Sequence, residues 1–156
     1  MLKVGVIGCG HLGKIHIKLL IQSKNYSLSG IFDSNSKISE LTALDFECKA
    51  YETFESMLEE IDVLDIVTPT PFHFEYAKTA IEKGIHVFIE KPVCSNIFES
   101  NELINTSKSH DVKIQVGHVE RFNPAYTAVE KNINKPMFIE SHRLAKFNPR
   151  GTDVSV

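Results

Sequence analysis

The residues with the clearest chemical potential are Glu90 and Lys91. They follow directly after a short, continuous apolar run, and Pro92 comes next. An ammonium group at the end of a buried strand can project into the crevice where an open α/β sheet binds its ligand, and a neighbouring carboxylate can hold its charge and position. The pair is therefore a candidate for chemistry at that crevice, with Lys91 as the candidate catalytic residue.

A second group of residues is suited to holding phosphate. Residues 8–13 read G-C-G-H-L-G, which is the G-x-G-x-x-G pattern, after one predicted strand and before a predicted helix. The first glycine permits a tight turn, the second lets a pyrophosphate approach the backbone, and the third lets the helix sit close to the strand. Free N–H groups at the helix start add partial positive charge. The sequence predicts a dinucleotide site at Gly8, Gly10, His11, Leu12 and Gly13.

An acidic residue stands where the adenosine ribose of a dinucleotide would lie. Asp33 comes 20 residues after Gly13, at the end of the second predicted strand, with Ser34 and Asn35 behind it. A carboxylate there accepts hydrogen bonds from the ribose hydroxyls and repels a 2′-phosphate. The pattern favours NAD over NADP, although Ser34 and Asn35 are small polar residues that tolerate a phosphate. The alternative is a purely structural glycine turn with a helix-capping aspartate.

A third candidate loop, T-P-T-P-F-H over residues 68–73, follows another predicted strand. Ligands of open α/β sheets bind at the carboxyl ends of the strands. Thr68, Pro69, Thr70 and His73 are therefore candidate cofactor-binding residues. The alternative is a strand exit stiffened by two prolines, in which Thr70 caps the next helix.

The periodicity of the chain predicts the scaffold that positions these candidates. Short β-rich runs alternate with amphipathic segments that place apolar residues three and four apart. The predicted strands are 3–7, 29–33, 63–67, 86–89 and 112–116, and the predicted helices are 12–23, 37–44, 53–59, 72–83 and 97–109. This is the pattern of an α/β fold, a Rossmann-type doubly wound parallel sheet. Apolar helix positions expected in its core include Leu19, Leu20, Leu41, Leu44 and Ile104.

The pattern changes after Gly117. Asn123 and Pro124 predict a helix start, and residues 137–145 read as one long strand with no helix after it. We therefore expect a Rossmann domain at residues 1–122 and the truncated start of an α+β substrate domain at residues 123–156, which leaves Phe138 and Ile139 exposed. The alternative is that the long strand extends the edge of the first sheet.

Composition excludes several classes of partner. The chain has 156 residues, with 17 Lys and Arg against 20 Asp and Glu, so no basic surface predicts nucleic acid binding. Apolar runs are too short to span a membrane and no signal peptide is evident, which predicts a cytoplasmic protein. Neither the three cysteines nor the histidines have the spacing of a disulfide framework or a metal site.

Together, the GCGHLG motif, Asp33, the TPTPFH loop and the E-K-P tripeptide resemble the Gfo/Idh/MocA family of NAD(P)-dependent oxidoreductases. The resemblance spans essentially the whole chain. His16 also matches a position where the family usually has histidine, and we interpret it as a packing residue. Residues 116–125 are similar to the segment of sugar-nucleotide members, notably UDP-N-acetyl-hexosamine and hexosaminuronate 3-dehydrogenases.

The resemblance implies hydride transfer between C3 of a sugar or sugar nucleotide and the nicotinamide of NAD. Lys91 would lie near the reacting hydroxyl, with Glu90 and Arg121 near the cofactor. A second proton-handling residue would lie beyond residue 156, so we expect these 156 residues alone to be inactive and the full-length protein to be a homo-oligomer. A non-catalytic dinucleotide-sensing regulator and a biliverdin- or imine-type reductase remain alternatives.

Overall fold

The computed structural model describes residues 1–140, 142 and 144. The chain forms two compact units, Met1–Gly117 and the residues from His118 onward. The division between the units falls after β5 (Ile114–Val116), ahead of the boundary predicted at residue 122.

Strands and helices alternate through the first unit, as the periodicity predicts. The strands are β1 (Leu2–Ile7), β2 (Tyr26–Phe32), β3 (Val63–Ile66), β4 (His86–Ile89) and β5. The helices are α1 (His11–Gln22), α2 (Ser36–Phe46), α3 (Phe54–Leu58), α4 (His73–Glu82) and α5 (Ile97–Ser109), with a short 3₁₀ helix, η1 (Thr70–Phe72), before α4. The predicted strands and helices of this unit are confirmed, with ends that differ by a few residues.

The five strands form one parallel sheet in the order β2-β1-β3-β4-β5. Outside β2, Ala50 makes a single parallel bridge with Ile31. This bridge occupies the position of the third strand in the Rossmann order. In that order, the direction in which successive strands are added to the sheet reverses between the first and fourth strands. The predicted Rossmann-type sheet is confirmed, with its outermost strand reduced to one bridge.

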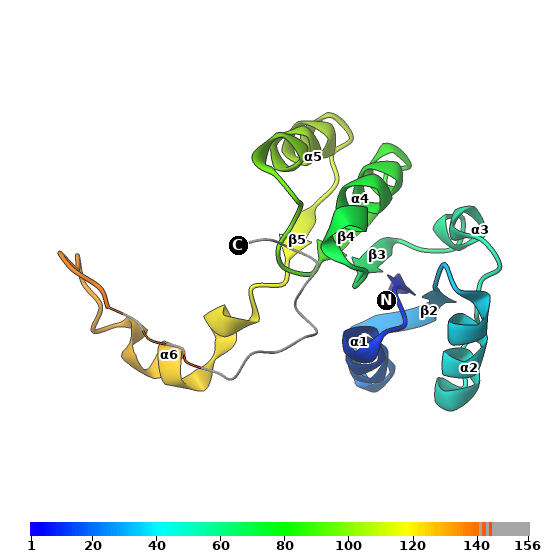
Figure 1. Cartoon of the computed structure of the whole chain (residues 1–156), viewed down its shortest axis with the longest axis horizontal. Helices are drawn as coiled ribbons and strands as arrows, with labels where there is room; N and C mark the ends of the chain where they lie inside the picture. The colour runs from blue at the N-terminus through cyan, green and yellow to red at the C-terminus, as the bar shows by residue number, and fades with distance from the viewer. Residues whose placement is uncertain (141, 143, 145–156) are drawn as a thin grey trace. The chain divides into compact units, whose positions relative to one another are not determined.

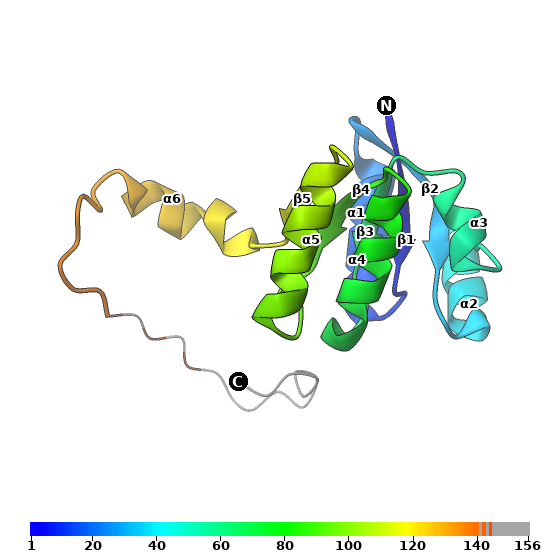
Figure 2. The ribbon, with the colours of Figure 1, turned by 90° about the horizontal axis from the view of Figure 1, so that it is seen from above.

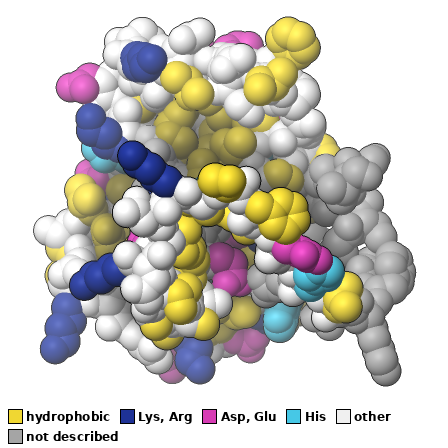
Figure 3. Space-filling view, turned by 90° about the vertical axis from the view of Figure 1, so that its left-hand side faces the viewer, with side chains coloured by type: hydrophobic (Ala, Val, Ile, Leu, Met, Phe, Trp, Pro, Cys, Tyr) yellow, Lys and Arg dark blue, Asp and Glu magenta, His cyan; other side chains and the backbone are white. Residues whose placement is uncertain are grey.

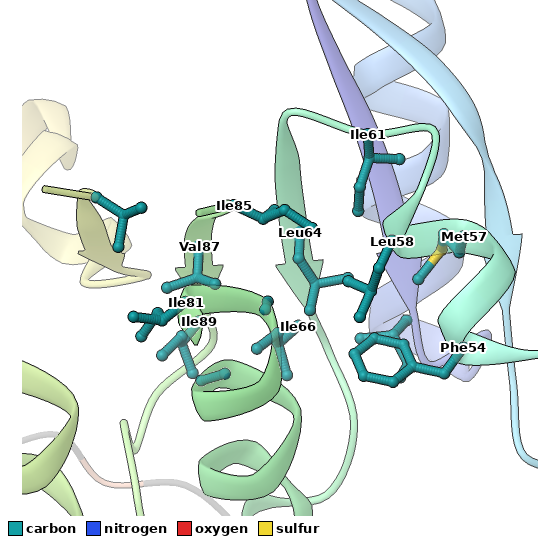
Figure 4. Close-up of a cluster of buried hydrophobic side chains, with 14 of the residues drawn as sticks. Phe54, Met57, Leu58, Ile61, Leu64, Ile66, Ile81, Ile85, Val87 and Ile89 are labelled. Carbon is teal, nitrogen blue, oxygen red and sulfur yellow. The ribbon is translucent and has the colours of Figure 1, made fainter. Parts of the chain in front are cut away.

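Helices cover both faces of this sheet, as parallel sheets require. Helices α4 and α5 lie on one face and α1 lies on the other (Figures 1 and 2). The larger hydrophobic core lies between the sheet and α3, α4 and α5 (Figure 4), and its labelled side chains are Phe54, Met57, Leu58, Ile61, Leu64, Ile66, Ile81, Ile85, Val87 and Ile89. A smaller core, which includes Val6, Ile17 and Ile31, lies beneath α1 and α2.

Several helix residues expected in the core are exposed. Helix α2 buries Ser39, Thr42 and Ala43, so Leu41 and Leu44 lie away from the sheet, with Leu44 76% exposed. Two further residues that were predicted to be buried, Leu19 and Ile104, are also exposed. Figure 3 shows one face of the chain, where hydrophobic side chains lie at the surface among acidic and basic ones. For Leu41 and Leu44 the prediction was wrong because α2 carries apolar residues three or four apart on more than one side, so their spacing alone does not identify the buried side.

The second unit contains η2 (Val119–Phe122), which is a 3₁₀ helix, and α6 (Pro124–Glu130). The predicted helix start is confirmed, since the Asn123 side chain accepts a hydrogen bond from the N–H of Ala125 at 3.0 Å. Among the helices that the structure describes, none has the length and apolar character needed to cross a membrane.

The strand predicted at residues 137–145 is not formed over 137–140, and residues 141, 143 and 145 lie outside the described part of the chain. A strand needs a neighbour to pair its backbone groups, and no described segment pairs with residues 137–140. The alternative of an added edge strand is not observed there either. Phe138 and Ile139 are 81% and 70% exposed, which confirms their predicted exposure.

Candidate functional site

The glycine-rich loop joins β1 to α1 and packs tightly against its neighbours. Gly8 has a φ of +97°, and its N–H donates to the Phe32 carbonyl at 2.9 Å. A Cβ at Gly8 would lie 2.7 Å from the Val67 carbonyl oxygen, and a Cβ at Gly13 would overlap the Gly8 carbonyl oxygen. Both positions therefore require glycine for the turn and for the close approach of α1.

Gly10 differs because the space in front of it is open. No described atom lies within 4 Å of the position that its Cβ would occupy. Gly10 precedes α1, a 12-residue helix that has no side-chain cap among the described residues and no acidic residue in its first turn. The N–H groups of His11 and Leu12 at this helix start carry partial positive charge. The loop thus fits the pyrophosphate of a dinucleotide, which such helix starts bind.

Asp33 lies directly after β2 and is fixed by the same loop. Its Oδ2 accepts a hydrogen bond from the Cys9 N–H at 2.8 Å, and its Oδ1 accepts one from the Asn35 N–H at 2.9 Å. A carboxylate has about four acceptor positions, so two remain for other donors such as ribose hydroxyls. Ser34 is exposed beside it.

The loop after β3 contributes a buried hydroxyl and a buried histidine. Thr68 Oγ1 is buried and has no hydrogen-bond partner among the described residues, while Pro69 beside it is exposed and Thr70 is buried. His73 is only 1% exposed, and its ring nitrogens lie 2.7 Å from the Thr68 carbonyl oxygen and 3.0 Å from the Pro92 carbonyl oxygen. His73 therefore connects the loop after β3 to the loop after β4, and its nitrogens face protein carbonyls.

Glu90 and Lys91 follow β4 at the same edge of the sheet. Glu90 is 6% exposed, whereas Lys91 is exposed. The Lys91 N–H donates to Glu90 Oε2 at 3.1 Å. A Cβ at Gly117 would lie 2.6 Å from Glu90 Oε1, so the carboxylate also packs against the exit of β5. The buried carboxylate thus supports the backbone that carries an accessible ammonium group.

His16, interpreted from the sequence as a packing residue, packs against Phe88 and also makes polar contacts. His16 Nδ1 lies 2.9 Å from Asp65 Oδ2, and His16 Nε2 lies 3.5 Å from Glu90 Oε1. Asp65 is in the middle of β3 and is 5% exposed. Sequence reasoning missed this residue, although an aspartate inside the apolar run at 63–67 was a signal that a buried polar partner must exist.

Burial and neighbouring charges shift the pKa values of His16 and Asp65. Burial lowers the pKa of His16, but the hydrogen bond and charge of Asp65 and the charge of Glu90 outweigh it, and the net effect is a raised pKa. Burial raises the pKa of Asp65, against the opposing effect of His16. Each shift means that the folded chain holds the proton of that group to a higher pH than the unfolded chain does.

A pH dependence of stability follows from these shifts. A raised pKa in the folded state means that stabilisation is present below the pKa of the unfolded chain, and is lost as pH rises through the folded value. We expect the free energy of unfolding contributed by His16 to fall as pH rises from about 6.5 through the higher pKa of His16 in the folded chain. Urea unfolding of the wild type and of His16→Gln across about pH 6–8.5 measures the free energy of unfolding at each pH. An equal dependence of this free energy on pH in both proteins would contradict the assignment to His16.

The thiol in the glycine-rich loop is not a nucleophile. Burial, followed by the charge of Asp33, raises the pKa of Cys9 to about 12. Thiolates are the reactive form of cysteine, so this thiol remains protonated and inert. In the part of the chain that the structure describes, no group of three or more His, Cys, Asp or Glu side chains is arranged to hold a metal ion.

The structure brings the residues predicted in the first unit to the carboxyl ends of β1 to β4. Arg121 instead lies in η2 of the second unit, where it is exposed. Its contact with a cofactor stays a prediction.

Known proteins resemble this chain in sequence and in fold. UDP-N-acetylglucosamine 3-dehydrogenase of Acidithiobacillus ferrooxidans is 34% identical over 156 residues, which cover 99% of this chain and 49% of that protein. A solved structure of that enzyme matches with a TM-score of 0.90 over 97% of this chain and 50% of the other. A scyllo-inositol dehydrogenase of Lactobacillus casei, solved with NAD(H) and scyllo-inositol, matches at 26% identity with a TM-score of 0.77, over 84% of this chain and 40% of the other.

The chain spans about half the length of the UDP-N-acetylglucosamine 3-dehydrogenase that it matches. Residues 2–118 match the Gfo/Idh/MocA family, which is described as an oxidoreductase family with an NAD-binding Rossmann fold. The matched range contains the glycine-rich loop, Asp33, the loop after β3 and the Glu90–Lys91 pair. The chain therefore belongs to the Gfo/Idh/MocA oxidoreductase family, and residues 2–118 form its NAD-binding Rossmann fold.

Proposed function

We propose that the whole protein is an NAD-dependent dehydrogenase that oxidises a hydroxyl of a sugar or sugar nucleotide, with C3 of a UDP-N-acetyl sugar as the favoured site. The observation that carries this proposal is the exposed Lys91 at the end of β4, at the same edge of the sheet as the glycine-rich loop. Similarity to UDP-N-acetylglucosamine 3-dehydrogenase along almost the entire chain supports the substrate class.

The dinucleotide has one orientation that suits these residues. Its pyrophosphate lies at the start of α1, and its adenosine ribose lies at Asp33, after β2. Because β3 and β4 lie on the other side of β1, the nicotinamide half extends over Thr68 and Glu90. The buried hydroxyl of Thr68 gains a partner in this arrangement.

Lys91 is the catalytic residue of this proposal. Its ammonium group donates a hydrogen bond to the substrate oxygen and stabilises the negative charge that develops there, while the hydroxyl proton passes to the second proton-handling residue that the family resemblance implies and the C–H bond gives up its hydride. A bound nicotinamide supplies the hydride acceptor. Glu90 holds the Lys91 backbone, and His73 holds the two loops together through the Thr68 and Pro92 carbonyls.

We further propose that Arg121 lies near the cofactor, that residues 123–156 begin the substrate domain, and that the whole protein is a homo-oligomer. Exposed apolar residues on α1, α2 and α5, which include Leu19, Leu41, Leu44 and Ile104, support an assembly that covers them. Sedimentation of the full-length protein tests the oligomer, and a monomer at micromolar concentration would refute it.

Asp33 determines the choice of cofactor in this proposal. Asp33→Asn removes the charge that repels a 2′-phosphate and retains an acceptor for the Cys9 N–H. We expect the ratio of the Kd for NADPH to the Kd for NADH to fall by about tenfold or more, because charged hydrogen bonds contribute about 1.5–3 kcal/mol. Fluorescence titration of the chain with both reduced nucleotides measures the ratio.

Asp62→Asn is the matched control for this experiment. Asp62 also accepts a backbone hydrogen bond, from the Lys3 N–H at 2.7 Å, but it precedes β3 and lies at the opposite edge of the sheet. We expect this variant to retain the wild-type ratio. Tighter binding of NADPH than NADH by the wild type would overturn the assignment of Asp33, and binding of neither nucleotide would overturn the proposed function.

A further inference from the structure

One imidazole joins three elements beneath the candidate catalytic residue. His16 projects from α1, Asp65 from β3, and Glu90 follows β4. The distances are 2.9 Å from His16 Nδ1 to Asp65 Oδ2 and 3.5 Å from His16 Nε2 to Glu90 Oε1. Glu90 Oε2 in turn accepts the Lys91 N–H at 3.1 Å. A continuous line of polar contacts therefore runs from Asp65 through His16 and Glu90 to the Lys91 backbone.

The hydrogen-bonding capacity of the ring decides which form satisfies this arrangement. Both carboxylates, when ionised, are acceptors only, and a neutral imidazole carries one N–H. His16 Nδ1 is within hydrogen-bond distance of Asp65 and Nε2 is within ion-pair distance of Glu90, so only the imidazolium can donate to Asp65 and present positive charge to Glu90 at once. Two carboxylates buried side by side without that cation would also repel each other.

We propose that protonated His16 is a positioning residue that holds Glu90 in place and thereby fixes the Lys91 backbone at the nicotinamide end of the site, and that loss of its proton loosens this hold. This inference depends on the proposed function only for the assignment of the nicotinamide to that end of the site. His16 acts through Glu90, and no contact between His16 and the substrate is invoked.

The surroundings of His16 contain the groups that this mechanism needs. The titratable groups that face its ring are Asp65 from β3 and Glu90 from the end of β4, and both are acidic. The Phe88 ring packs edge-on at 6.0 Å and carries no charge. The two acidic groups raise the pKa of His16 against the effect of burial, so the imidazolium persists to a higher pH than in an ordinary histidine.

Nuclear magnetic resonance of the isotope-labelled 156-residue chain tests the proposal without any variant. We expect the two ring nitrogens of His16 to be protonated together up to a midpoint above 6.5, the ordinary value. The amide resonance of Lys91 is expected to shift with the same midpoint, because its hydrogen-bond partner is released. A Lys91 amide that stays unchanged while His16 titrates, or a His16 ring with one proton below pH 6.5, would overturn the proposal.

Three variants separate positioning from general structural support. His16→Gln provides one donor at most and should abolish the pH-dependent shift of Lys91, whereas Asp65→Asn should lower the His16 midpoint. His110→Gln is the matched control, since His110 is an exposed histidine of the same unit at the end of α5. This variant should retain the wild-type pH dependence of the Lys91 amide resonance. Loss of that dependence in the control would refute a specific role for His16.

Binding of NADH connects the network to the site. We expect the wild-type Kd for NADH to rise by about fivefold or more as pH rises through the His16 midpoint, which is the lower end of the usual coupling between two sites. The Kd of His16→Gln should not change over the same pH range. An unchanged wild-type Kd across the titration would refute the functional part of the inference. A chain that binds no NADH at any pH would contradict the proposed function, and the Lys91 resonance would still decide whether His16 holds Glu90.

Discussion

Replacement of Lys91 by methionine is expected to lower the kcat of the full-length enzyme by about 10²–10⁴-fold, the range that a positioned proton donor or acceptor contributes. Methionine retains the unbranched stem and removes the ammonium group. Because Lys91 is exposed while its backbone is held by Glu90, the change leaves the surrounding structure in place. The rate of NADH formation from NAD and a UDP-N-acetyl sugar measures it.

Two controls make this result specific. The Lys91→Met protein should bind NADH with an affinity close to that of the wild type, because the proposed pyrophosphate and adenosine contacts lie at the glycine-rich loop and Asp33. Lys83→Met changes an exposed lysine at the end of α4, at the opposite edge of the sheet, and should leave kcat unchanged. A Lys91→Met enzyme with full turnover would remove Lys91 from the chemistry, and a cellular role that survives the change would favour the dinucleotide-sensing alternative.

The second large effect concerns the two glycines that frame the start of the loop. Gly8→Ala places a methyl group 2.7 Å from the Val67 carbonyl at a φ of +97°, so we expect it to lower the free energy of unfolding by about 2–5 kcal/mol and to abolish NADH binding. Gly10→Ala meets no described atom and should change stability by about 1 kcal/mol or less. Its methyl group lies where the pyrophosphate approaches, so its NADH affinity should fall by about 10- to 100-fold.

Urea unfolding and NADH titration of the same proteins separate the two effects. Gly84→Ala is the matched control, because Gly84 has a φ of +78° but open space around its Cβ position. It should lose some stability through backbone strain and bind NADH normally when folded. Wild-type affinity in Gly10→Ala would show that the pyrophosphate does not approach Gly10, and would contradict the placement of the dinucleotide.

The local signals in the sequence were sufficient for the scaffold and for the glycine-rich loop. Strands and helices follow from the spacing of apolar residues, which is a property of neighbouring positions. The loop follows from backbone chemistry, since only glycine fits the turn at Gly8 and the contact at Gly13. Asp33 was found because the length of one β-α-β step fixes its distance from the loop.

Local signals failed where an answer depends on what lies across space. The apolar spacing of α2 did not show that Ser39, Thr42 and Ala43 face the sheet in place of Leu41 and Leu44. The β-rich run at 137–145 did not show whether a partner strand exists, and residues 137–140 remain unpaired among the described residues. Helix spacing and strand propensity describe a segment, whereas burial and pairing belong to its neighbours.

The sequence by itself determined an α/β Rossmann unit with a glycine-rich loop, an aspartate at the end of the second strand and a Glu–Lys pair after a buried strand. Only the tertiary structure decided that His73 joins two loops and that His16 lies between Asp65 and Glu90. His16 and Asp65 are 49 residues apart in the chain, and no local pattern relates them. They meet because α1 packs on β1 and β2, from where His16 reaches Asp65 on the adjacent strand β3. The burial of Asp65 there requires a polar partner that only another element can supply.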